Sequence, residues 1–499
     1  MTEMSPLSLA ALLIVVSSVA ISIWLRTRNS KYPPGPPSKP LIGNILHAPN
    51  HGAWKVFTEW SKTYGNLVFL HGLGNKVLVV NNIELIAELF EQRWSTYSHR
   101  PTFTVVGELM GVDQSLALMP YCDEWRESRK LTGIALNPGA IKKYQVLQED
   151  ITALLNKEIL DSPEDFFQHV RLAAGRVALS VTYGIHAQNI RDPFIADAEE
   201  CMDIMGRGMN PGAFLADLIP ILKYLPSWVP FQKEAARGKE VVLKTVELPY
   251  LAVKEMIADG TARPSFAKDL LDLGNIDPVF DHRAMWSTSA MYGAGTETTY
   301  ATTLTFLLAM TINQDVQRRA QDEIDSVIGT DRMPTIRDAQ KLPYTMAVIK
   351  ETMRWHPSVP LSIPRRTAQD DIVNGYFIPK DTVVIPNLWA ISRDTKDPEQ
   401  FNPDRFLNSS DTTTDPSAWI FGIGRRICPG RHLAEASLMA IIPGILSAFD
   451  ISPKNSETLE AKFTSKHISI PEKFQCQILP RSLEKEELIK TRASEARLG

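Results

Sequence analysis

The sequence predicts a mainly α-helical protein with small β-sheets at two places along the chain. Between about residue 94 and residue 343, apolar residues recur at spacings of three and four, the pattern of helices that bury one face. Short runs with strand character lie before this stretch and again after residue 357. The 499 residues contain no internal repeat and no low-complexity linker in the interior. We therefore expect one large domain, residues 41–499, behind a short N-terminal segment.

Local patterns place the individual elements. Helices are expected at Trp54–Tyr64, Ile83–Arg93, Pro278–Ile312, Tyr344–His356 and Leu433–Leu446. Strands are expected at Leu67–Leu70, Lys76–Val80, Leu361–Ile363, Gly375–Ile378 and Thr382–Ile385, with a further strand pair at His467–Ile470 and Phe474–Leu479. The charged tail, Glu484–Arg497, is expected to be a solvated helix or disordered.

The N-terminus contains a long apolar run. Pro6–Leu25 holds 20 residues without a charge, and a helix of that length spans roughly 30 Å, the thickness of a bilayer core. Basic residues follow the run and a single acidic residue precedes it, so the positive-inside rule orients the rest of the chain toward the cytoplasm. Residues 1–31 are predicted to be a single-pass membrane anchor with a basic flank, and a cleaved signal peptide is the alternative. The proline-rich residues 32–40 are expected to form a stiff hinge.

Charge and cysteine usage exclude some classes of function. The formal net charge is −4, so nothing global favours binding to nucleic acid. The four cysteines lie far apart and form no Cys-x-x-Cys pair, which favours a reducing compartment over a disulfide-stapled secreted domain. They also lack the spacing of a zinc site. Any metal chemistry must therefore use a single thiolate or arrive with a cofactor.

The segment from Phe421 to Gly430, FGIGRRICPG, is the most informative part of the sequence. Its glycines, Gly422, Gly424 and Gly430, permit backbone positions closed to other residues, so the chain can curl under a flat ligand. Cys428 lies in this segment, before an apolar helix and beside two arginines, a setting that keeps a thiolate deprotonated. The alternative is a structural buried cysteine in a glycine-rich turn.

Half of these ten positions match the signature F-x-x-G-x-R-x-C-x-G, and on this match the chain resembles the cytochrome P450 family. The matching residues are Phe421, Gly424, Arg426, Cys428 and Gly430. The resemblance implies the cytochrome P450 fold and a haem b cofactor whose iron takes the Cys428 thiolate as axial ligand. It also implies that Arg426 binds a haem propionate, that Phe421 shields the sulfur, and that Gly424 and Gly430 belong to the cofactor site.

Two further segments match motifs of the same family. Glu351 and Arg354 lie three residues apart in a predicted helix, so they share a face and can pair. Taken alone, such a pair is usually solvated. Together with Arg405 in the segment PDRF, it resembles the Glu-x-x-Arg pair and the meander arginine of the family. The resemblance implies that Glu351, Arg354 and Arg405 form a buried charge cluster that holds the haem-binding core, and Asp404, where the family usually has glutamate, leaves that cluster intact.

The segment AGTETT, residues 294–299, lies within the longest predicted helix. Gly293 and Gly295 each cost up to about 1 kcal/mol in mid-helix, and threonine hydroxyls can bond back to the preceding turn and bend the helix. Taken alone, this pattern indicates a kinked core helix. It also resembles the family's (A/G)-G-x-(D/E)-T segment. That resemblance implies that Thr298 hydrogen-bonds the oxygen being activated and that Glu297 relays protons toward it.

Other basic residues are candidates for the cofactor site. Trp125 and Arg129 lie four apart in one predicted helix and resemble a W-x-x-x-R element, so both are expected to face one propionate. Arg365 occupies a position that often adds a propionate contact in the family, and His99 or Arg100 is a further candidate. A docking patch for an electron donor is expected from Arg126, Lys130, Lys142, Lys143, Arg425 and Arg431. For each of these, an ordinary surface residue is the alternative.

The resemblance implies a monooxygenase that hydroxylates or otherwise oxidises a small apolar substrate with O₂ and electrons from NADPH, delivered by NADPH–cytochrome P450 reductase. As a microsomal-type member, the chain is expected in the endoplasmic reticulum membrane, with its catalytic domain facing the cytosol. Residues 427–434 and 470–481 resemble fungal enzymes of secondary metabolism similar to O-methylsterigmatocystin oxidoreductase. The expected substrate wall is apolar and includes Phe103, Met110, Met205, Met209, Phe214, Met285 and Leu361. A haem-thiolate isomerase or dehydratase that uses no O₂, and a non-catalytic haem sensor, are the alternatives.

Overall fold

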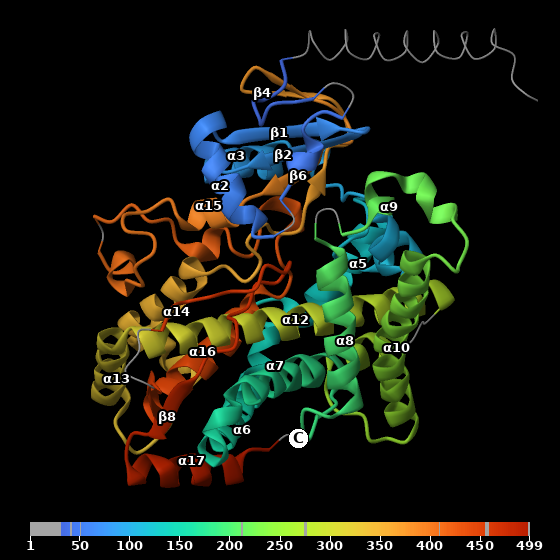
Figure 1. Cartoon of the computed structure of the whole chain (residues 1–499). Helices are drawn as coiled ribbons and strands as arrows, with labels where there is room; N and C mark the ends of the chain where they lie inside the picture. The colour runs from blue at the N-terminus through green and yellow to red at the C-terminus, as the bar shows by residue number, and fades with distance from the viewer. Residues whose placement is uncertain are drawn as a thin grey trace, which may run out of the picture.

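The computed structural model describes residues 31–39, 42–49, 51–210, 213–273, 277–408, 410–454 and 459–497 (Figure 1). The fold is mainly helical with small sheets, as the sequence predicts. The helices are α2 (Ala53–Tyr64), α3 (Ile83–Ala87), α4 (Trp94–Tyr97), α5 (Asp123–Leu136), α6 (Gln145–Asp161), α7 (Phe166–Tyr183), α8 (Pro193–Gly208), α9 (Leu215–Leu218), α10 (Pro230–Ala258), α11 (Phe266–Leu271), α12 (Pro278–Ile312), α13 (Gln314–Ile328), α14 (Pro343–Trp355), α15 (Leu388–Ser392), α16 (Arg431–Ala448) and α17 (Leu483–Glu495).

Short strands form small sheets. They are β1 (Leu67–Gly72), β2 (Asn75–Val80), β3 (Arg365–Arg366), β4 (Asp371–Val373), β5 (Tyr376–Ile378), β6 (Val383–Pro386), β7 (Phe449–Pro453) and β8 (Cys476–Pro480). One sheet has the order β1-β2-β6-β3, in which β2 and β6 run parallel and the other pairs antiparallel. The pairs β4–β5 and β7–β8 are antiparallel. Strand β6, which follows the long helical stretch in sequence, thus pairs with β2 of the N-terminal hairpin.

Two of the predicted strands are wrong. The residues Leu361–Ile363 form no strand, and His467–Ile470 does not pair with β8. The partner of β8 is β7, which places Ile478 opposite Ile451. Both side chains are buried against the helices, so burial of alternate residues, rather than nearness in sequence, decides this pairing.

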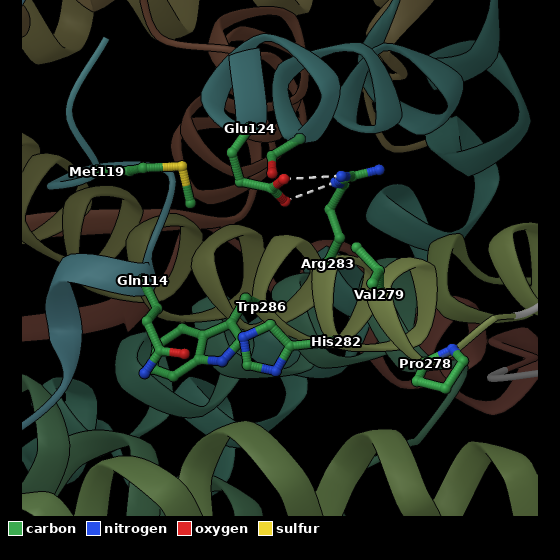
Figure 2. Close-up of a pocket in the computed structure, with 9 residues that line it drawn as sticks. Gln114, Met119, Glu124, Pro278, Val279, His282, Arg283 and Trp286 are labelled. Atoms are coloured by element: carbon green, nitrogen blue, oxygen red, sulfur yellow. Dashed lines mark hydrogen bonds and ion pairs between the residues drawn. The ribbon is translucent and has the colours of Figure 1, made fainter. Parts of the chain in front are cut away.

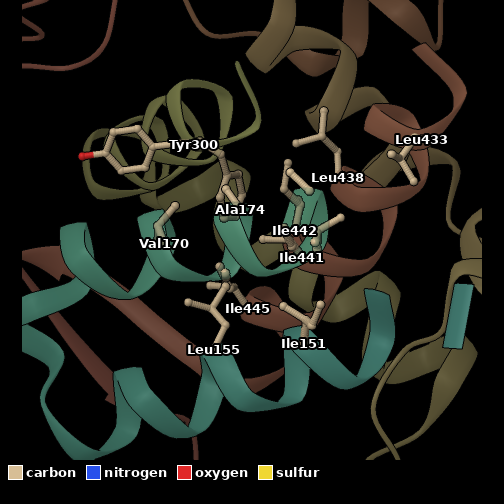
Figure 3. Close-up of a cluster of buried hydrophobic side chains, with 14 of the residues drawn as sticks. Ile151, Leu155, Val170, Ala174, Tyr300, Leu433, Leu438, Ile441, Ile442 and Ile445 are labelled. Carbon is tan, nitrogen blue, oxygen red and sulfur yellow. The ribbon is translucent and has the colours of Figure 1, made fainter. Parts of the chain in front are cut away.

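Helix α12 passes through the middle of the molecule, with α7 and α16 packed against it (Figure 1). The largest apolar cluster lies between these helices and α6. Figure 3 shows Leu155 of α6, Ala174 of α7, Tyr300 of α12 and Ile445 of α16 meeting in it. The loop before α16 and the middle turns of α12 are therefore held on one rigid body.

Truncation of Ile445 to alanine is expected to lower the free energy of unfolding by about 2–5 kcal/mol, because this fully buried side chain leaves a cavity. The control is Val146→Ala on α6, where the side chain is 64% exposed and the expected change is within about 0.5 kcal/mol. Urea titrations followed by circular dichroism measure both changes. Equal shifts of the two midpoints would contradict the packing described here.

The predicted membrane anchor, Pro6–Leu25, lies outside the described residues. Within the ranges that the structure describes, no helix is both long enough and apolar enough to cross a bilayer. On this finding we correct the prediction of a single-pass protein of the endoplasmic reticulum membrane with a cytosol-facing catalytic domain.

The two ends of the described chain lie on the fold. In the described part of the predicted hinge, the Pro34 carbonyl accepts from Phe69 N at 2.9 Å, and the Tyr32 ring stacks on Phe69 at 5.0 Å between centroids. The charged tail forms α17, which packs on α6 with Ile489 buried and Arg492 bonded to Asp150. The tail is thus a docked helix, not a freely solvated or disordered one.

Candidate active site

The loop from residue 419 to residue 430, here called the Cys428 loop, leads into α16. Its fold depends on two backbone bonds: Cys428 N donates to the Phe421 carbonyl at 2.7 Å, and Ile427 N donates to the Gly424 carbonyl at 3.0 Å. Gly424 has a φ of 72°, and a Cβ there would lie 2.0 Å from the Phe90 carbonyl oxygen. Only glycine fits this position, both for its backbone and for the space available.

The other two glycines of the loop differ in backbone conformation. Gly422 has a φ of 77°, whereas Gly430 has a φ of −87°, which any residue adopts. The predicted need for an unusual backbone is therefore wrong at Gly430. This residue lies beside the sulfur: its backbone N–H hydrogen-bonds Cys428, and a Cβ built on it would be 3.9 Å from Sγ.

Burial raises the pKa of the Cys428 thiol. The N–H of Gly430 and the charges of Arg129 and Arg431 oppose that rise, because they favour the thiolate. Coordination to a metal ion deprotonates such a thiol outright. A partly buried sulfur with N–H and cationic neighbours therefore suits the iron ligand that the sequence predicts.

The two arginines that flank the cysteine in sequence are not the ones that act on the sulfur. The guanidinium of Arg425 lies over the Trp94 ring, 4.8 Å from its centroid. Arg426 points away and donates through Nε to the Ser98 carbonyl at 2.9 Å. The prediction that this pair keeps the thiolate deprotonated is wrong, because the Arg425 guanidinium lies over Trp94 and the buried Arg426 guanidinium is engaged by main-chain carbonyls.

Four guanidinium groups gather near the loop without a carboxylate partner among the described residues; we call Arg100, Arg129, Arg365 and Arg426 the arginine cluster. Their hydrogen bonds go to main-chain carbonyls: Arg426 Nη2 donates to Met119 at 2.7 Å, and Arg365 Nη2 to Ile423 at 2.5 Å. Arg100 Nη1 likewise donates to two carbonyls at 2.7 and 2.8 Å.

Burial and mutual repulsion act on this cluster. Burial, followed by the charge of Arg100, lowers the pKa of Arg426 to about 8. Burial and a neighbouring guanidinium lower the pKa of Arg100 and of Arg365 to about 9 each. Arg365 Nη1 is buried and has no hydrogen-bond partner in the described part of the chain. A ligand with two carboxylates, such as the propionates of haem b, supplies the missing charge and the missing acceptor, so these residues fit that group.

Trp125 and Arg129 on α5 take different positions. The Trp125 indole N–H donates to the Leu116 carbonyl at 3.2 Å, and its ring lies 4.2 Å from the Arg426 guanidinium. Trp125 thus supports Arg426 rather than facing a propionate through its own N–H. Arg129 is half-buried, and its nearest charges are Cys428 and Arg431.

The middle of α12 borders open space. Ala294 is exposed, although the helix runs through the middle of the molecule (Figure 1). The Thr298 hydroxyl donates to the Ala294 carbonyl at 3.0 Å. Glu297 instead faces α7, where its Oε1 accepts from Arg171 Nη1 at 2.8 Å. The structure therefore places Thr298 at the open face and does not bring the Glu297 carboxyl to it.

The predicted charge cluster of α14 is assembled in the structure. Glu351 is fully buried and accepts from Arg354 Nε at 2.7 Å, from Arg405 Nε at 3.2 Å and from the Asn402 backbone N at 2.7 Å. Asp404 points outward and pairs with exposed Arg319. The cluster ties α14 to the segment around Arg405.

The predicted substrate wall is only partly one surface. One apolar cluster contains Phe103, Met110, Met205, Met209, Phe214 and Met285. Leu361 packs against a different cluster, beside β1 and β2. The predicted docking patch is also divided, because Arg126, Lys130 and Lys143 form ion pairs with nearby acids.

Two arginines, Arg100 and Arg171, have a larger part in the site than their sequence context indicates. Arg100 was only one of two alternatives, yet it belongs to the arginine cluster. Arg171 carried no local signal, yet it holds Glu297 and lies 4.2 Å over the Tyr300 ring. Single arginines in helices and loops are common, so only the fold could have selected these two.

Comparison with known proteins agrees with this geometry. The sequence matches the cytochrome P450 family over residues 33–478. It is 38% identical to the cytochrome P450 monooxygenase COX2 of Coprinopsis cinerea, over 92% of this chain and 90% of that protein. It is 36% identical to cytochrome P450 monooxygenase 208 of Postia placenta, over 96% of each chain, and 34% identical to the monooxygenase claR of Ampulloclitocybe clavipes, over 95% and 91%. The chain therefore belongs to the cytochrome P450 family of haem-thiolate monooxygenases.

Proposed function

We propose that the protein binds haem b between the Cys428 loop and α12 and oxidises a small apolar molecule with O₂. The observation that carries this proposal is the arginine cluster, a set of guanidinium groups without carboxylate partners among the described residues, beside the partly buried Cys428 thiol. The bound haem supplies O₂ activation and the oxidising power. In the overall reaction, one oxygen atom of O₂ enters a C–H bond of the substrate, and the other leaves as water with two electrons and two protons.

The protein's own residues hold the cofactor. Cys428 would hold the haem iron through its thiolate, and Arg365 and Arg426 would hold the propionates, which is supported by the partnerless Nη1 of Arg365. Arg129 adds positive charge beside the sulfur, and Phe421 covers it. Glu351, Arg354 and Arg405 keep the surrounding chain fixed, which is supported by their burial and their shared hydrogen bonds.

Glu297 and Thr298 supply protons to the open face of α12. Burial raises the pKa of Glu297 against the opposing effect of Arg171, so its carboxyl keeps a proton closer to neutral pH than a surface glutamate does. The proton moves on when this carboxyl turns from Arg171 toward Thr298. The Thr298 hydroxyl then donates into the open space beside Ala294 instead of to its carbonyl.

Thr298→Ala is expected to retain haem but to divert electrons from NADPH into hydrogen peroxide, because the hydroxyl no longer positions the proton donor. Product formed per NADPH should fall by about tenfold or more. The control is Thr302→Ala, one turn along α12, whose hydroxyl bonds the Thr298 carbonyl at 2.9 Å in the same way. Peroxide and product are measured together, and unchanged coupling in Thr298→Ala would remove this residue from the mechanism.

The substrate we propose is a small apolar intermediate of fungal secondary metabolism, and the donor is NADPH–cytochrome P450 reductase. The methionine- and phenylalanine-rich cluster around Met205 supports an apolar ligand. The relatives in the comparison are fungal and are named monooxygenases, which speaks against an isomerase or dehydratase that uses no O₂. Lys142 and Arg431 are the basic residues we assign to the docking face for the donor.

We further propose that residues 41–499 form the catalytic domain and residues 32–40 its N-terminal hinge. The family match begins at residue 33 and ends at residue 478. Helix α17 lies beyond that match and packs on α6, which supports its inclusion in the same domain.

The proposal is tested by reducing the purified protein with NADPH and the reductase under carbon monoxide. The expected result is the Soret absorbance of a thiolate-ligated haem. Absorbance of a nitrogen-ligated haem, or purification without porphyrin, would overturn the assignment of Cys428. Titration of the ferric protein with terpenoid, polyketide and indole panels then identifies the substrate class through the shift of the Soret band.

A further inference from the structure

A cavity of about 390 Å³ opens between the first turns of α5, the first turns of α12 and the segment 112–122, which begins with the short 3₁₀ helix η4 (Val112–Gln114) (Figure 2). Its walls come from Gln114 and Met119 in that segment, from Glu124 and Ser128 on α5, and from five residues of α12: Pro278, Val279, His282, Arg283 and Trp286. None of the residues assigned above to the haem, the protons or the substrate wall lines it. Its volume is within the range of small-molecule pockets.

The walls of this cavity are largely apolar and aromatic. Met119, Pro278 and Val279 contribute apolar surface. Trp286 is only 5% exposed, and its ring lies 6.3 Å from the ring of His282 (Figure 2). An indole held in this way offers a rigid surface against which a flat molecule can pack.

Two donor groups line the cavity without a hydrogen-bond partner among the described residues. Ser128 is 4% exposed, and its hydroxyl forms no hydrogen bond with any residue that the structure describes. The same holds for the indole N–H of Trp286. Neither atom is completely buried, so water or a ligand in the cavity can accept a hydrogen bond from each of them. Both groups can donate, so the molecule that fits them carries an acceptor oxygen.

The charges at the rim cancel each other. Arg283 donates through Nε and Nη2 to the two carboxylate oxygens of Glu124, at 2.7 and 2.8 Å, and links α12 to α5 (Figure 2). A bidentate pair of this kind leaves no net charge for a ligand to neutralise. The cavity therefore favours a neutral molecule over an anion or a cation.

We propose that this cavity is a second small-molecule site, which takes a neutral, flat, mostly apolar molecule with a carbonyl oxygen, such as an aromatic lactone or ketone. It shares no residue with the predicted substrate wall, although Trp286 packs in the same apolar cluster. The site is linked to the arginine cluster through Met119, which lines the cavity and whose carbonyl accepts from Arg426 at 2.7 Å. Since coupling between two sites is reciprocal, haem occupancy and occupancy of this cavity should affect each other.

Coumarin, a neutral aromatic lactone, is the probe. Calorimetric titration is carried out on the haem-loaded protein with its iron blocked by 4-phenylimidazole, so that binding near the iron does not contribute. We expect the probe to bind the blocked protein. Val279→Trp, which fills the cavity from its rim, should weaken binding by at least about tenfold. The matched control is Val146→Trp on α6, because Val146 is 64% exposed and Val279 62%; it should leave binding unchanged.

Two further variants address the polar contacts. Trp286→Phe keeps an aromatic wall and removes the N–H, and Ser128→Ala removes the hydroxyl; each should weaken coumarin binding by about threefold to tenfold. Absence of coumarin binding to the blocked protein, or equal binding by wild type and Val279→Trp, would overturn the proposal. If Val279→Trp does not fold, equal binding by wild type, Ser128→Ala and Trp286→Phe would overturn it. No step of catalysis enters this measurement, so its failure is distinct from failure of the proposed function.

Discussion

Glu351→Gln is expected to lower the free energy of unfolding by about 3–5 kcal/mol. The amide keeps the shape of the carboxylate but removes its charge, which leaves the guanidinium groups of Arg354 and Arg405 buried without compensation. Glu351 is 0% exposed and Arg354 is 1% exposed, so water cannot take over the lost interaction. The change is measured as the shift of the urea midpoint, together with the fraction of protein that retains haem.

Asp404→Asn is the matched control, because it also converts an acid of an Arg–carboxylate pair into its amide. Its pair with Arg319 is about half exposed on both sides, and such pairs contribute about 0–1 kcal/mol. Comparison of the two variants therefore separates the effect of burying an ion pair from the effect of charge pairing itself. A similar midpoint for both variants would mean that the Glu351 cluster does not hold the core.

Arg365→Met is expected to change the haem-free and the haem-loaded protein in opposite directions. Without haem, the buried guanidinium is repelled by Arg426 and its Nη1 has no partner, so a methionine should stabilise the protein by about 1–3 kcal/mol. With haem, the same substitution removes a charge-assisted bond to a propionate. The affinity for haem should fall by about tenfold to a hundredfold.

Thermal unfolding of the haem-free protein and the rate of haem transfer to albumin measure these two effects. Arg425→Met is the control, since Arg425 is exposed and lies over Trp94 instead of within the cluster. Arg425→Met should change the thermal stability of the haem-free protein and the rate of haem transfer by only a small fraction of the effect of Arg365→Met. Loss of stability in both states of Arg365→Met would show that this arginine serves packing alone.

Local sequence signals were sufficient to predict some elements of the fold. Helix α12 runs from Pro278 to Ile312, the bounds predicted from sequence. The Asp277 side chain accepts from Phe280 N at 2.8 Å, and a proline occupies the first turn, so the start of the helix is encoded within four residues. The Cys428 loop could be predicted equally well, because its glycines and its cysteine lie in one short segment of the sequence.

Contacts between distant segments could not be predicted in this way. Arg100 acquires its place from the carbonyls of Ile363 and Pro364, more than 260 residues along the chain. Glu297 and Thr298 are adjacent in sequence, yet a helix turns by about 100° per residue, so their side chains face different neighbours. The resemblance assigned a joint task to this pair, but only the structure shows that Arg171 holds one of them.

The contact between the Cys428 loop and the N-terminal part of the chain has a consequence for biosynthesis. Gly424 fits against the Phe90 carbonyl, and Arg426 bonds the Ser98 carbonyl across 328 residues of sequence. A polypeptide emerging from the ribosome has its early half exposed long before the cysteine is translated. The pocket for the prosthetic group therefore closes only near the end of translation, and shortened nascent chains cannot capture haem.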